Sequence, residues 1–361
     1  MPPAAPATIT IAIDGRGAER GPRTLVNGAQ KALAAAPELR LRVYGDPREV
    51  ADLADERVEL LEAPEEITND DEPVAAVRSR ASASIVRAAA DVAAGGADAL
   101  VSAGSTGGTM AASTFALRRI HGVRRPALAL QLLVPGRSGP PILILDVGAN
   151  SDARTGDLVQ FAFLGSAFSR AVLRVARPRV ALLSVGEEAG KGTVAVVDAH
   201  TQLRELAEGG IDLAFAGNIE GRDLLRGAAE VIVTDGFTGN VVLKTIEGTA
   251  RAVADGVRAA ARSSPIAMAG GLLLRGALGE LRERMDPETT GGAVMLGLRK
   301  MAVVAHGSSG PTGIANAILL ARRAVAERAA ERTAELLEAS GATRAALRDR
   351  KSAMTPDEVD A

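Results

Sequence analysis

Short apolar runs rich in β-branched residues alternate with longer Ala-rich segments along almost the whole chain. This alternation is typical of βαβ units, so it predicts a mostly parallel sheet with helices on both faces, an α/β/α sandwich of the α/β class. Helices are predicted in segments such as Ser79–Ala94 and Asp157–Val175, and Pro311–Leu337 is predicted to form one helix or two. The predicted strands are Thr8–Ile13, Leu39–Tyr44, Ala99–Ser102, Ile142–Asp146, Val180–Val185, Leu213–Ala216, Val231–Thr234 and Met301–Val304.

No internal repeat and no low-complexity linker divides the chain. We therefore predict a single domain over residues 9–337, with two lobes around a cleft. Residues 1–8 contain three prolines and are predicted to be a flexible tail. Residues 338–361 are predicted to hold the end of the last helix and a disordered tail.

Glycine and small polar residues follow many of the predicted strands. The segment Val231–Thr245 contains a strand, a loop with Asp235, Gly236 and Gly239, and the start of a helix. In an open parallel sheet, ligands bind beyond the carboxyl ends of the strands, and helix N-termini favour anions. Similar loops follow other strands, at Ser102–Gly108, Asp146–Asn150, Gly186–Thr193, Gly217–Asp223 and Ala305–Gly310. One such loop is an ordinary turn, but so many together predict a site for a polar ligand.

Composition excludes several classes of chemistry. The 361 residues carry a formal net charge of -2 and 2% aromatic residues, which gives no case for nucleic acid binding. Cysteine is absent, so disulfides, thiolate metal ligands and a covalent acyl-cysteine are excluded. Only three histidines are present, far apart, and we expect no metal and no cofactor. We find no apolar run long enough to span a membrane and no signal peptide, so we expect a cytoplasmic protein.

Three familiar motifs fail on inspection. Gly186–Thr193 resembles a phosphate-binding P-loop, but it is one residue short and Gly192 separates Lys191 from the hydroxyl residue. Asp14–Gly21 is close to a dinucleotide fingerprint, but Glu19 and Pro22 stand where the pyrophosphate and helix start are expected. No GxSxG is present, so a serine hydrolase elbow is not expected.

Five motifs together carry a family resemblance. They are DVGAN at 146–150, GEEAGKG at 186–192, GNIEGRD at 217–223, DGFTGNVVLKT at 235–245 and AHGSS at 305–309. In order and spacing the chain resembles the bacterial PlsX-type phosphate acyltransferases from about Ile9 to Ala324. Departures occur at Ala18 and Glu19, where the family usually has Gly and Asp, at Ser105 in place of Asn, and at Gly310 where Asp often follows.

The resemblance implies a fold similar to isopropylmalate dehydrogenases and phosphotransacetylases. It also implies transfer of a fatty acyl group from acyl carrier protein to inorganic phosphate, which gives acyl phosphate for phospholipid synthesis. A homodimer, peripheral membrane contact and a downstream glycerol-3-phosphate acyltransferase are further expectations from the family. The alternatives are a short-chain phosphotransacetylase that uses acyl-CoA, and a non-catalytic membrane scaffold for fatty-acid enzymes. A dehydrogenase is less well supported, because we cannot assemble its carboxylate-rich metal cluster here.

Direct attack of phosphate on a thioester requires an anion site and charge stabilisation more than a covalent nucleophile. Lys191 is the first candidate for that charge, although it could instead pair with Glu187 or Glu188 on the surface. His306 could protonate the leaving thiolate or bind phosphate, or merely cap the following helix. Asp235 and Asn240 complete the catalytic candidates. The predicted substrate- and phosphate-binding residues are Ser102, Gly104, Thr106, Asn150, Gly190, Gly192, Gly236, Lys244, Ser308 and Ser309. We expect His121 and His200 to be surface residues.

Two segments are candidates for partner contact. Arg118, Arg119, Arg124 and Arg125 could form a basic patch for acidic acyl carrier protein, or a solvated loop. Ser263–Met285 is apolar and amphipathic, and could be a protruding hairpin that contacts lipid, a dimer interface or a core helix.

Overall fold

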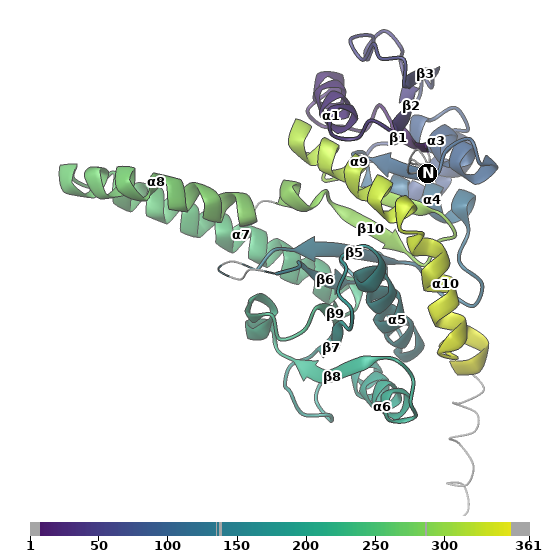
Figure 1. Ribbon diagram of the computed structural model, residues 1–361, viewed down its shortest axis with the longest axis vertical. Helices are drawn as coiled ribbons and strands as arrows, with labels where there is room; N and C mark the ends of the chain where they lie inside the picture. Colours follow the sequence, from purple (N-terminus) through teal and green to yellow (C-terminus); the bar gives the residue numbers. More distant parts are fainter. Residues whose placement is uncertain (1–7, 135, 137–138, 286, 348–361) are drawn as a thin grey trace, which may run out of the picture.

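One large sheet organises the molecule, as the computed structural model shows for residues 8–134, 136, 139–285 and 287–347 (Figure 1). In this part of the chain eleven strands are joined in the order β3-β2-β1-β4-β11-β10-β5-β6-β9-β7-β8. The strands are β1 (Ile9–Asp14), β2 (Leu39–Gly45), β3 (Val58–Glu62), β4 (Ala99–Ser102), β5 (Ala127–Leu132), β6 (Ile142–Leu145), β7 (Arg179–Leu183), β8 (Ala214–Ile219), β9 (Val231–Val233), β10 (Ala293–Leu296) and β11 (Met301–Val304).

The sheet contains two parallel groups that run in opposite directions. Strands β3, β2, β1, β4 and β11 are parallel to one another, and so are β6, β9, β7 and β8. Between the groups, β10 is antiparallel to both β11 and β5, and β5 is antiparallel to β6. The strand direction reverses from β11 to β10, again from β10 to β5 and again from β5 to β6. The second group therefore runs opposite to the first. The strand ends form two opposite edges of the sheet. The carboxyl ends of β1, β4 and β11 therefore lie at one of these edges, and those of β6, β9, β7 and β8 at the other.

Helices cover both faces of the sheet, and each face has its own apolar core. Small and branched residues at helical spacing pack against strands that are buried on both sides. The first face is covered by α1 (Pro22–Ala35), α5 (Thr155–Ala171), α6 (Val194–Glu208), α9 (Pro311–Ala326) and α10 (Ala329–Ala339). The second is covered by α2 (Pro73–Ser79), α3 (Ser84–Ala94), α4 (Thr106–Leu117) and the start of α7 (Gly236–Ala261).

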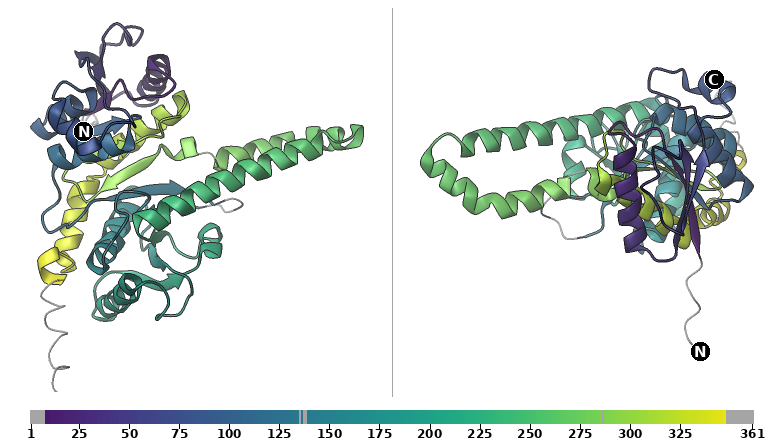
Figure 2. Two further views of the ribbon diagram at one scale, coloured as in Figure 1. Left: turned by 180° about the vertical axis from the view of Figure 1, so that it is seen from behind. Right: turned by 90° about the horizontal axis from the view of Figure 1, so that it is seen from above.

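The long helix α7 continues beyond the sheet and forms an antiparallel pair with α8 (Pro265–Met285). This helical arm projects far from the body of the molecule (Figures 1 and 2). A short 3₁₀ turn, Pro287–Thr290, follows α8 and packs against the beginning of α9. A second 3₁₀ turn, Gly221–Arg226, follows β8.

The predicted fold class is confirmed: the sheet is mostly parallel and helices lie on both of its faces. All eight predicted strands are present within a few residues, and Pro311–Leu337 forms two helices. Three strands were missed, β3, β5 and β10. The one sheet runs without a break through residues 9–304, and the division into two lobes stays a prediction. The tail predictions for 1–7 and 348–361 lie outside the described residues.

Candidate functional site

The loop after β6 is organised around a fully buried carboxylate, Asp146. Its oxygens accept the backbone N–H groups of Leu128 at 3.0 Å, Ala149 at 2.9 Å and Asn150 at 2.7 Å, and the Asn150 Nδ2 group at 2.8 Å. Burial raises the pKa of Asp146 above its usual value, although the hydrogen bonds from Ala149 and Asn150 act in the opposite direction. Asn150 also donates to the carbonyl of Pro126 at 2.8 Å. Its amide is thus fixed in place by two acceptors.

The beginning of α7 packs directly onto this loop. Asp235 is the N-cap of the helix, and its carboxylate accepts the Thr238 N–H at 2.8 Å and the Thr238 hydroxyl at 2.7 Å. The Gly236 N–H donates to the Asn150 carbonyl at 2.7 Å. A Cβ on Gly239 would lie 1.9 Å from the Asp146 carbonyl oxygen, so only glycine fits there. The structure therefore brings Asn150, Asp235 and Gly236 together, with Asp235 in a capping position.

Asn240 and Lys244 follow on the exposed side of the same helix. Asn240 lies beside the 146–150 loop, because a Cβ built on Gly148 would be 3.9 Å from the Asn240 side chain. Lys244 pairs with Glu247 one turn later, at 3.0 Å. Of the two, Asn240 is the side chain next to the loop, and Lys244 is already engaged in an exposed ion pair.

The loop after β7 carries Lys191 at the same edge of the sheet. Lys191 is exposed, and no ion pair or side-chain hydrogen bond of its ammonium group is found among the described residues. Glu187, one of its two possible partners, contacts Arg222 at 3.4 Å instead. The Ser184 hydroxyl donates to the Lys191 carbonyl at 2.8 Å, and Gly192 has a φ of 118° that favours glycine. The backbone of this loop is held, while its one ammonium group is available to an anion.

The other predicted residues lie at the opposite edge, around a second buried carboxylate. Asp14 accepts hydroxyl hydrogen bonds from Ser84 at 2.5 Å and Ser102 at 2.8 Å, and burial raises its pKa above the usual value. Ser102 also accepts the Thr109 hydroxyl at 2.9 Å and the Gly104 N–H at 3.0 Å. Ser102 is fully buried and all these contacts are internal, so it holds the loop in shape. Gly104 is buried with it, and Thr106 is exposed at the start of α4.

His306 lies in the loop after β11, at this second edge. Its Nδ1 atom faces the Ser308 hydroxyl at 2.8 Å and the Ser308 N–H at 3.2 Å, so this nitrogen is the acceptor and Nε2 carries the proton of the neutral ring. The imidazole is exposed and Ser309 is buried. The Glu19 N–H donates to the Gly307 carbonyl at 3.1 Å. This hydrogen bond joins the loop after β1 to the loop after β11.

The structure does not bring His306 and Lys191 to the same end of the sheet. Strands β11 and β7 are five steps apart in the sheet order, which is about 24 Å at about 4.8 Å per step. Their carboxyl ends also point to opposite edges. The predicted residues therefore form two groups, one around Asn150, Asp235 and Lys191, and one around Ser102 and His306.

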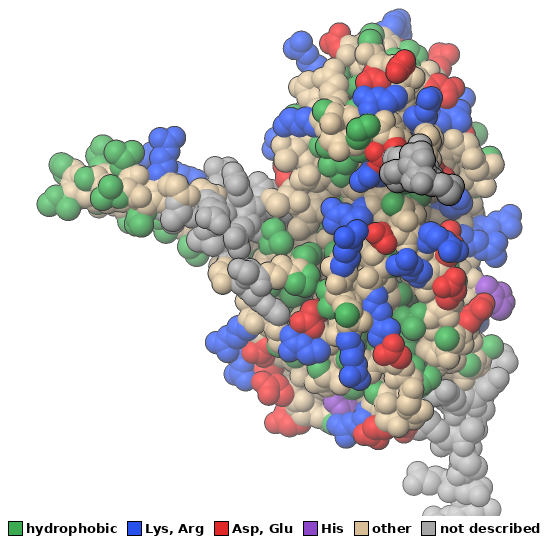
Figure 3. All heavy atoms as spheres, in the orientation of Figure 1, with side chains coloured by type: hydrophobic (Ala, Val, Ile, Leu, Met, Phe, Trp, Pro, Cys, Tyr) green, Lys and Arg blue, Asp and Glu red, His purple; other side chains and the backbone are tan. Residues whose placement is uncertain are grey.

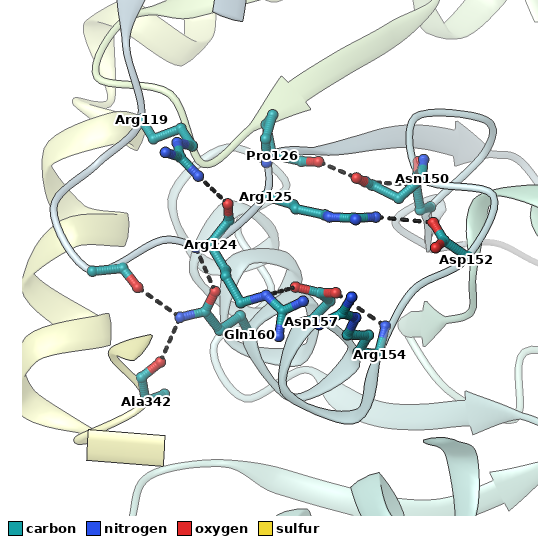
Figure 4. Close-up of polar contacts among 12 residues, drawn as sticks. Arg119, Arg124, Arg125, Pro126, Asn150, Asp152, Arg154, Asp157, Gln160 and Ala342 are labelled. Carbon is teal, nitrogen blue, oxygen red and sulfur yellow. Dashed lines mark hydrogen bonds and ion pairs between the residues drawn. The ribbon is translucent and has the colours of Figure 1, made fainter. Parts of the chain in front are cut away.

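The loop of residues 118–125, which carries four arginines, lies beside the group that contains Asn150 (Figure 4). Arg124 contacts the fully buried carboxylate of Asp157 at 3.0 Å, and Arg125 contacts Asp152 at 3.1 Å. Arg119 donates to the Arg124 carbonyl. Arg118 and Arg119 are exposed, whereas Arg124 and Arg125 are half-buried. The loop is thus partly structural, and Arg125 is the arginine that extends toward the Asn150 side of the site (Figure 4).

One sequence expectation about histidine was wrong. His121 is exposed as expected, but His200 is only 4% exposed and is hydrogen bonded on both ring nitrogens. Its charged neighbours in sequence suggested the surface, yet helix periodicity places it with Val196 and Leu203 on the buried face of α6. Among the described residues no group of three or more His, Asp or Glu side chains is arranged to hold a metal ion.

Comparison with known proteins agrees with this architecture. Three solved phosphotransacetylases or phosphotransacylases share the fold at low identity. The EutD phosphotransacetylase from Staphylococcus aureus has a TM-score of 0.56 and 16% identity, covering 90% of this chain and 96% of that one. A phosphotransacetylase from Streptococcus pyogenes has a TM-score of 0.56 and 17% identity over 90% and 94% of the two chains. The chain therefore shares the fold of these solved structures.

Sequence relatives define the family more closely. A family model described as "Fatty acid synthesis protein" matches residues 9–332. A phosphate acyltransferase of Thermobifida fusca is 46% identical over 333 residues, which is 91% of this chain and 90% of the relative. One from Geobacillus sp. is 43% identical over 318 residues, 88% of this chain and 94% of the relative. The chain belongs to this fatty acid synthesis protein family.

Proposed function

We propose that this protein is a phosphate acyltransferase that moves a fatty acyl group from acyl carrier protein to inorganic phosphate. The observation that carries the proposal is the extent of similarity to phosphate acyltransferases, 46% identity over 91% of the chain. The Lys191 loop supports it, because its glycines flank an exposed ammonium group that has no partner among the described residues, an arrangement that suits an anion at the carboxyl end of β7. The phosphotransacetylase alternative rests only on a shared fold at 16–17% identity.

The reaction needs no covalent enzyme intermediate. A phosphate oxygen attacks the thioester carbonyl carbon, the new C–O bond forms, and the C–S bond breaks as the tetrahedral intermediate collapses. The thiolate of the carrier leaves and takes a proton, and the acyl phosphate remains. We assign to Lys191 the binding of phosphate charge, and to Asn240 neutral hydrogen bonds at the neighbouring strand end. Asn150 shapes the loop beside it, because both of its amide protons are donated to Asp146 and Pro126. Asp235 orders this wall as the cap of α7.

The test is release of free carrier from long-chain acyl-carrier-protein thioester by the purified full chain, with and without phosphate. Phosphate-dependent release with formation of acyl phosphate is the expected result. Release only from short-chain acyl-CoA would favour the phosphotransacetylase alternative. No phosphate-dependent release from either donor would overturn the transferase proposal and leave the scaffold alternative.

His306 and Lys191 are expected to act independently, because the sheet holds them at opposite edges. Mutations at sites more than about 10 Å apart add within about 0.5 kcal/mol. In a double-mutant cycle with Lys191→Ala and His306→Ala, we therefore expect the losses in log kcat/KM to be additive. Strong non-additivity would show that both side chains act on one reacting group. In that case the division of the candidate residues into two independent groups would be abandoned.

Acyl carrier protein is proposed to dock beside Arg118 and Arg119, the exposed arginines at the end of α4. Its acidic surface complements them, and exposed charges of this kind mainly steer association. Arg118→Glu with Arg119→Glu should lower kcat/KM for the carrier thioester and weaken its salt dependence. The control is Arg174→Glu, an exposed arginine paired with Glu327 on another surface. Equal effects of the two changes would argue against docking here.

The helical arm is proposed to contact a lipid surface with its tip. Ile266 is 86% exposed and Leu273 87%, and hydrophobic side chains gather at the end of the arm (Figure 3). Residues 256–279 contain three arginines and no acidic residue, which suits anionic headgroups. Leu272→Asp with Leu273→Asp should reduce co-sedimentation with anionic liposomes and leave the acyl-transfer rate in solution unchanged. The control is Val74→Asp, at an exposed apolar residue on α2. Unchanged sedimentation would remove lipid contact.

A homodimer and supply of acyl phosphate to a glycerol-3-phosphate acyltransferase complete the proposed role. No helix in the described residues is long and apolar enough to cross a bilayer. Light scattering of the full chain tests the dimer, with a single-chain mass as the contradicting result. A coupled assay with the acyltransferase tests the second step.

A further inference from the structure

A line of hydrogen bonds runs from the buried His200 on α6 to the loop that carries Lys191. The His200 Nδ1 atom lies 2.9 Å from Asn218 Oδ1, and its Nε2 atom lies 2.9 Å from the Arg204 guanidinium. The Asn218 Nδ2 group donates to the Glu188 carbonyl at 2.9 Å. That carbonyl also accepts the Lys191 N–H at 3.0 Å. The contacts thus connect α6, β8 and the Lys191 loop.

The proton positions along this line determine one another. A guanidinium can only donate, so the Arg204 contact makes His200 Nε2 an acceptor, and the ring proton must be on Nδ1. Nδ1–H then donates to Asn218, which fixes the amide oxygen toward the histidine and the NH₂ group toward Glu188. A flipped amide would set two donors against each other at His200 and two acceptors against each other at Glu188. His200 therefore sets the orientation in which Asn218 can hold the loop.

An irregularity in β8 brings Asn218 into this position. The pairing of β7 with β8 shifts between Val180 and Ala181, so that Phe215 pairs with Val180 and Gly217 with Ala181. In a regular strand, residues 215 and 218 would face opposite sides of the sheet. Because the bulge adds one residue, both reach His200, and the Phe215 ring meets the imidazole edge-on at 5.1 Å. Gly217 has a φ of 88°, which favours glycine at the bulge.

We propose that His200 and Asn218 are positioning residues, which hold the Lys191 loop in the shape that binds phosphate. The proposal rests on the assignment of Lys191 to phosphate binding. Neither residue touches the substrate. They act through the Glu188 carbonyl, which fixes the loop backbone three residues before Lys191. Removal of the link should therefore weaken phosphate binding more than binding of the acyl donor.

Asn218→Asp is the first test, because it keeps the shape and the contact with His200 but sets a carboxylate oxygen against the Glu188 carbonyl in place of the N–H donor. We expect the KM for phosphate to rise about tenfold or more, because one hydrogen bond is lost and two acceptors then face each other, while the KM for the acyl donor is unchanged. Faster amide hydrogen exchange across residues 187–192 is expected in the same variant. The matched control is Gln160→Glu, a buried amide on α5 that donates to the carbonyls of Gly122 and Ala342.

Two further variants separate positioning from packing. His200→Phe keeps a buried ring and should reproduce the Asn218→Asp effect. His200→Asn keeps an N–H donor near the place of Nδ1 and should restore much of the phosphate affinity. The proposal is overturned if both Asn218→Asp and His200→Phe match the control in phosphate KM and in loop exchange. If Lys191→Ala retains full phosphate affinity, the assignment of Lys191 fails, whereas the exchange measurement still reports whether the link holds the loop.

Discussion

Replacement of Lys191 by Ala should raise the KM for phosphate and lower kcat for acyl transfer by about 10²–10³-fold, the usual effect of losing one charge-stabilising group. The ammonium is exposed and has no partner among the described residues, so its removal breaks no ion pair or hydrogen bond within that part of the protein. The thermal midpoint should therefore stay close to that of the parent. Steady-state kinetics with varied phosphate, together with a thermal melt, measure both expectations.

The control for this change is Lys31→Ala. Lys31 is exposed on α1 and contacts the Thr312 hydroxyl at 3.2 Å, at the start of α9 and away from the Lys191 group. The Lys31→Ala substitution removes the same charge and should leave kcat unaltered. Full activity of the Lys191→Ala variant would take this residue out of the mechanism.

A methyl group at Gly239 should destabilise the protein strongly, by about 3 kcal/mol or more. The new Cβ would be placed 1.9 Å from the Asp146 carbonyl oxygen, and the neighbour is backbone that cannot rotate away. To relieve the clash, α7 must move off the 146–150 loop, so the arrangement of Asn150 and Asp235 should be lost as well. Urea denaturation of Gly239→Ala measures the first effect, and residual activity of the folded fraction measures the second.

Gly248→Ala provides the control in the same helix. Nothing lies within 4 Å of a Cβ built there, so the change should stabilise the protein slightly through its higher helix propensity. A stability of Gly239→Ala equal to that of Gly248→Ala would mean that α7 is not tightly packed against the loop.

The sequence correctly predicted the long, strongly patterned elements, but it did not predict the relative directions of the strands in the sheet. Every predicted strand ran from an apolar, β-branched segment into a glycine loop. The strands β5 and β10 depart from that pattern, because ALALQL contains no β-branched residue and AVML contains only one. These are the strands that reverse the sheet. Without them, the sequence could not show that the loops follow strands of two oppositely directed groups.

Individual side chains show a second limit of sequence reasoning. Ser102 and Asp235 have the residue types of ligand-binding groups, but their hydrogen-bonding capacity is used by Asp14 and Thr238. Whether a hydroxyl or carboxylate is available to a ligand depends on partners that are distant in sequence, such as Asp14 and Ser102, separated by 88 residues. The role of His200 depends on a bulge in β8 that no local pattern announces.

Helix α7 begins at the Asp235 cap and ends at the tip of the helical arm, with no break between them. Its 26 residues span about 39 Å, at about 1.5 Å per residue. The distance between the candidate site and a surface that contacts the tip is therefore set by the number of residues in one rigid helix. No flexible linker contributes to that distance. Inserting or deleting whole turns in the outer half of the arm would change that distance in steps of about 5.4 Å, while the cap and its loop stay in place.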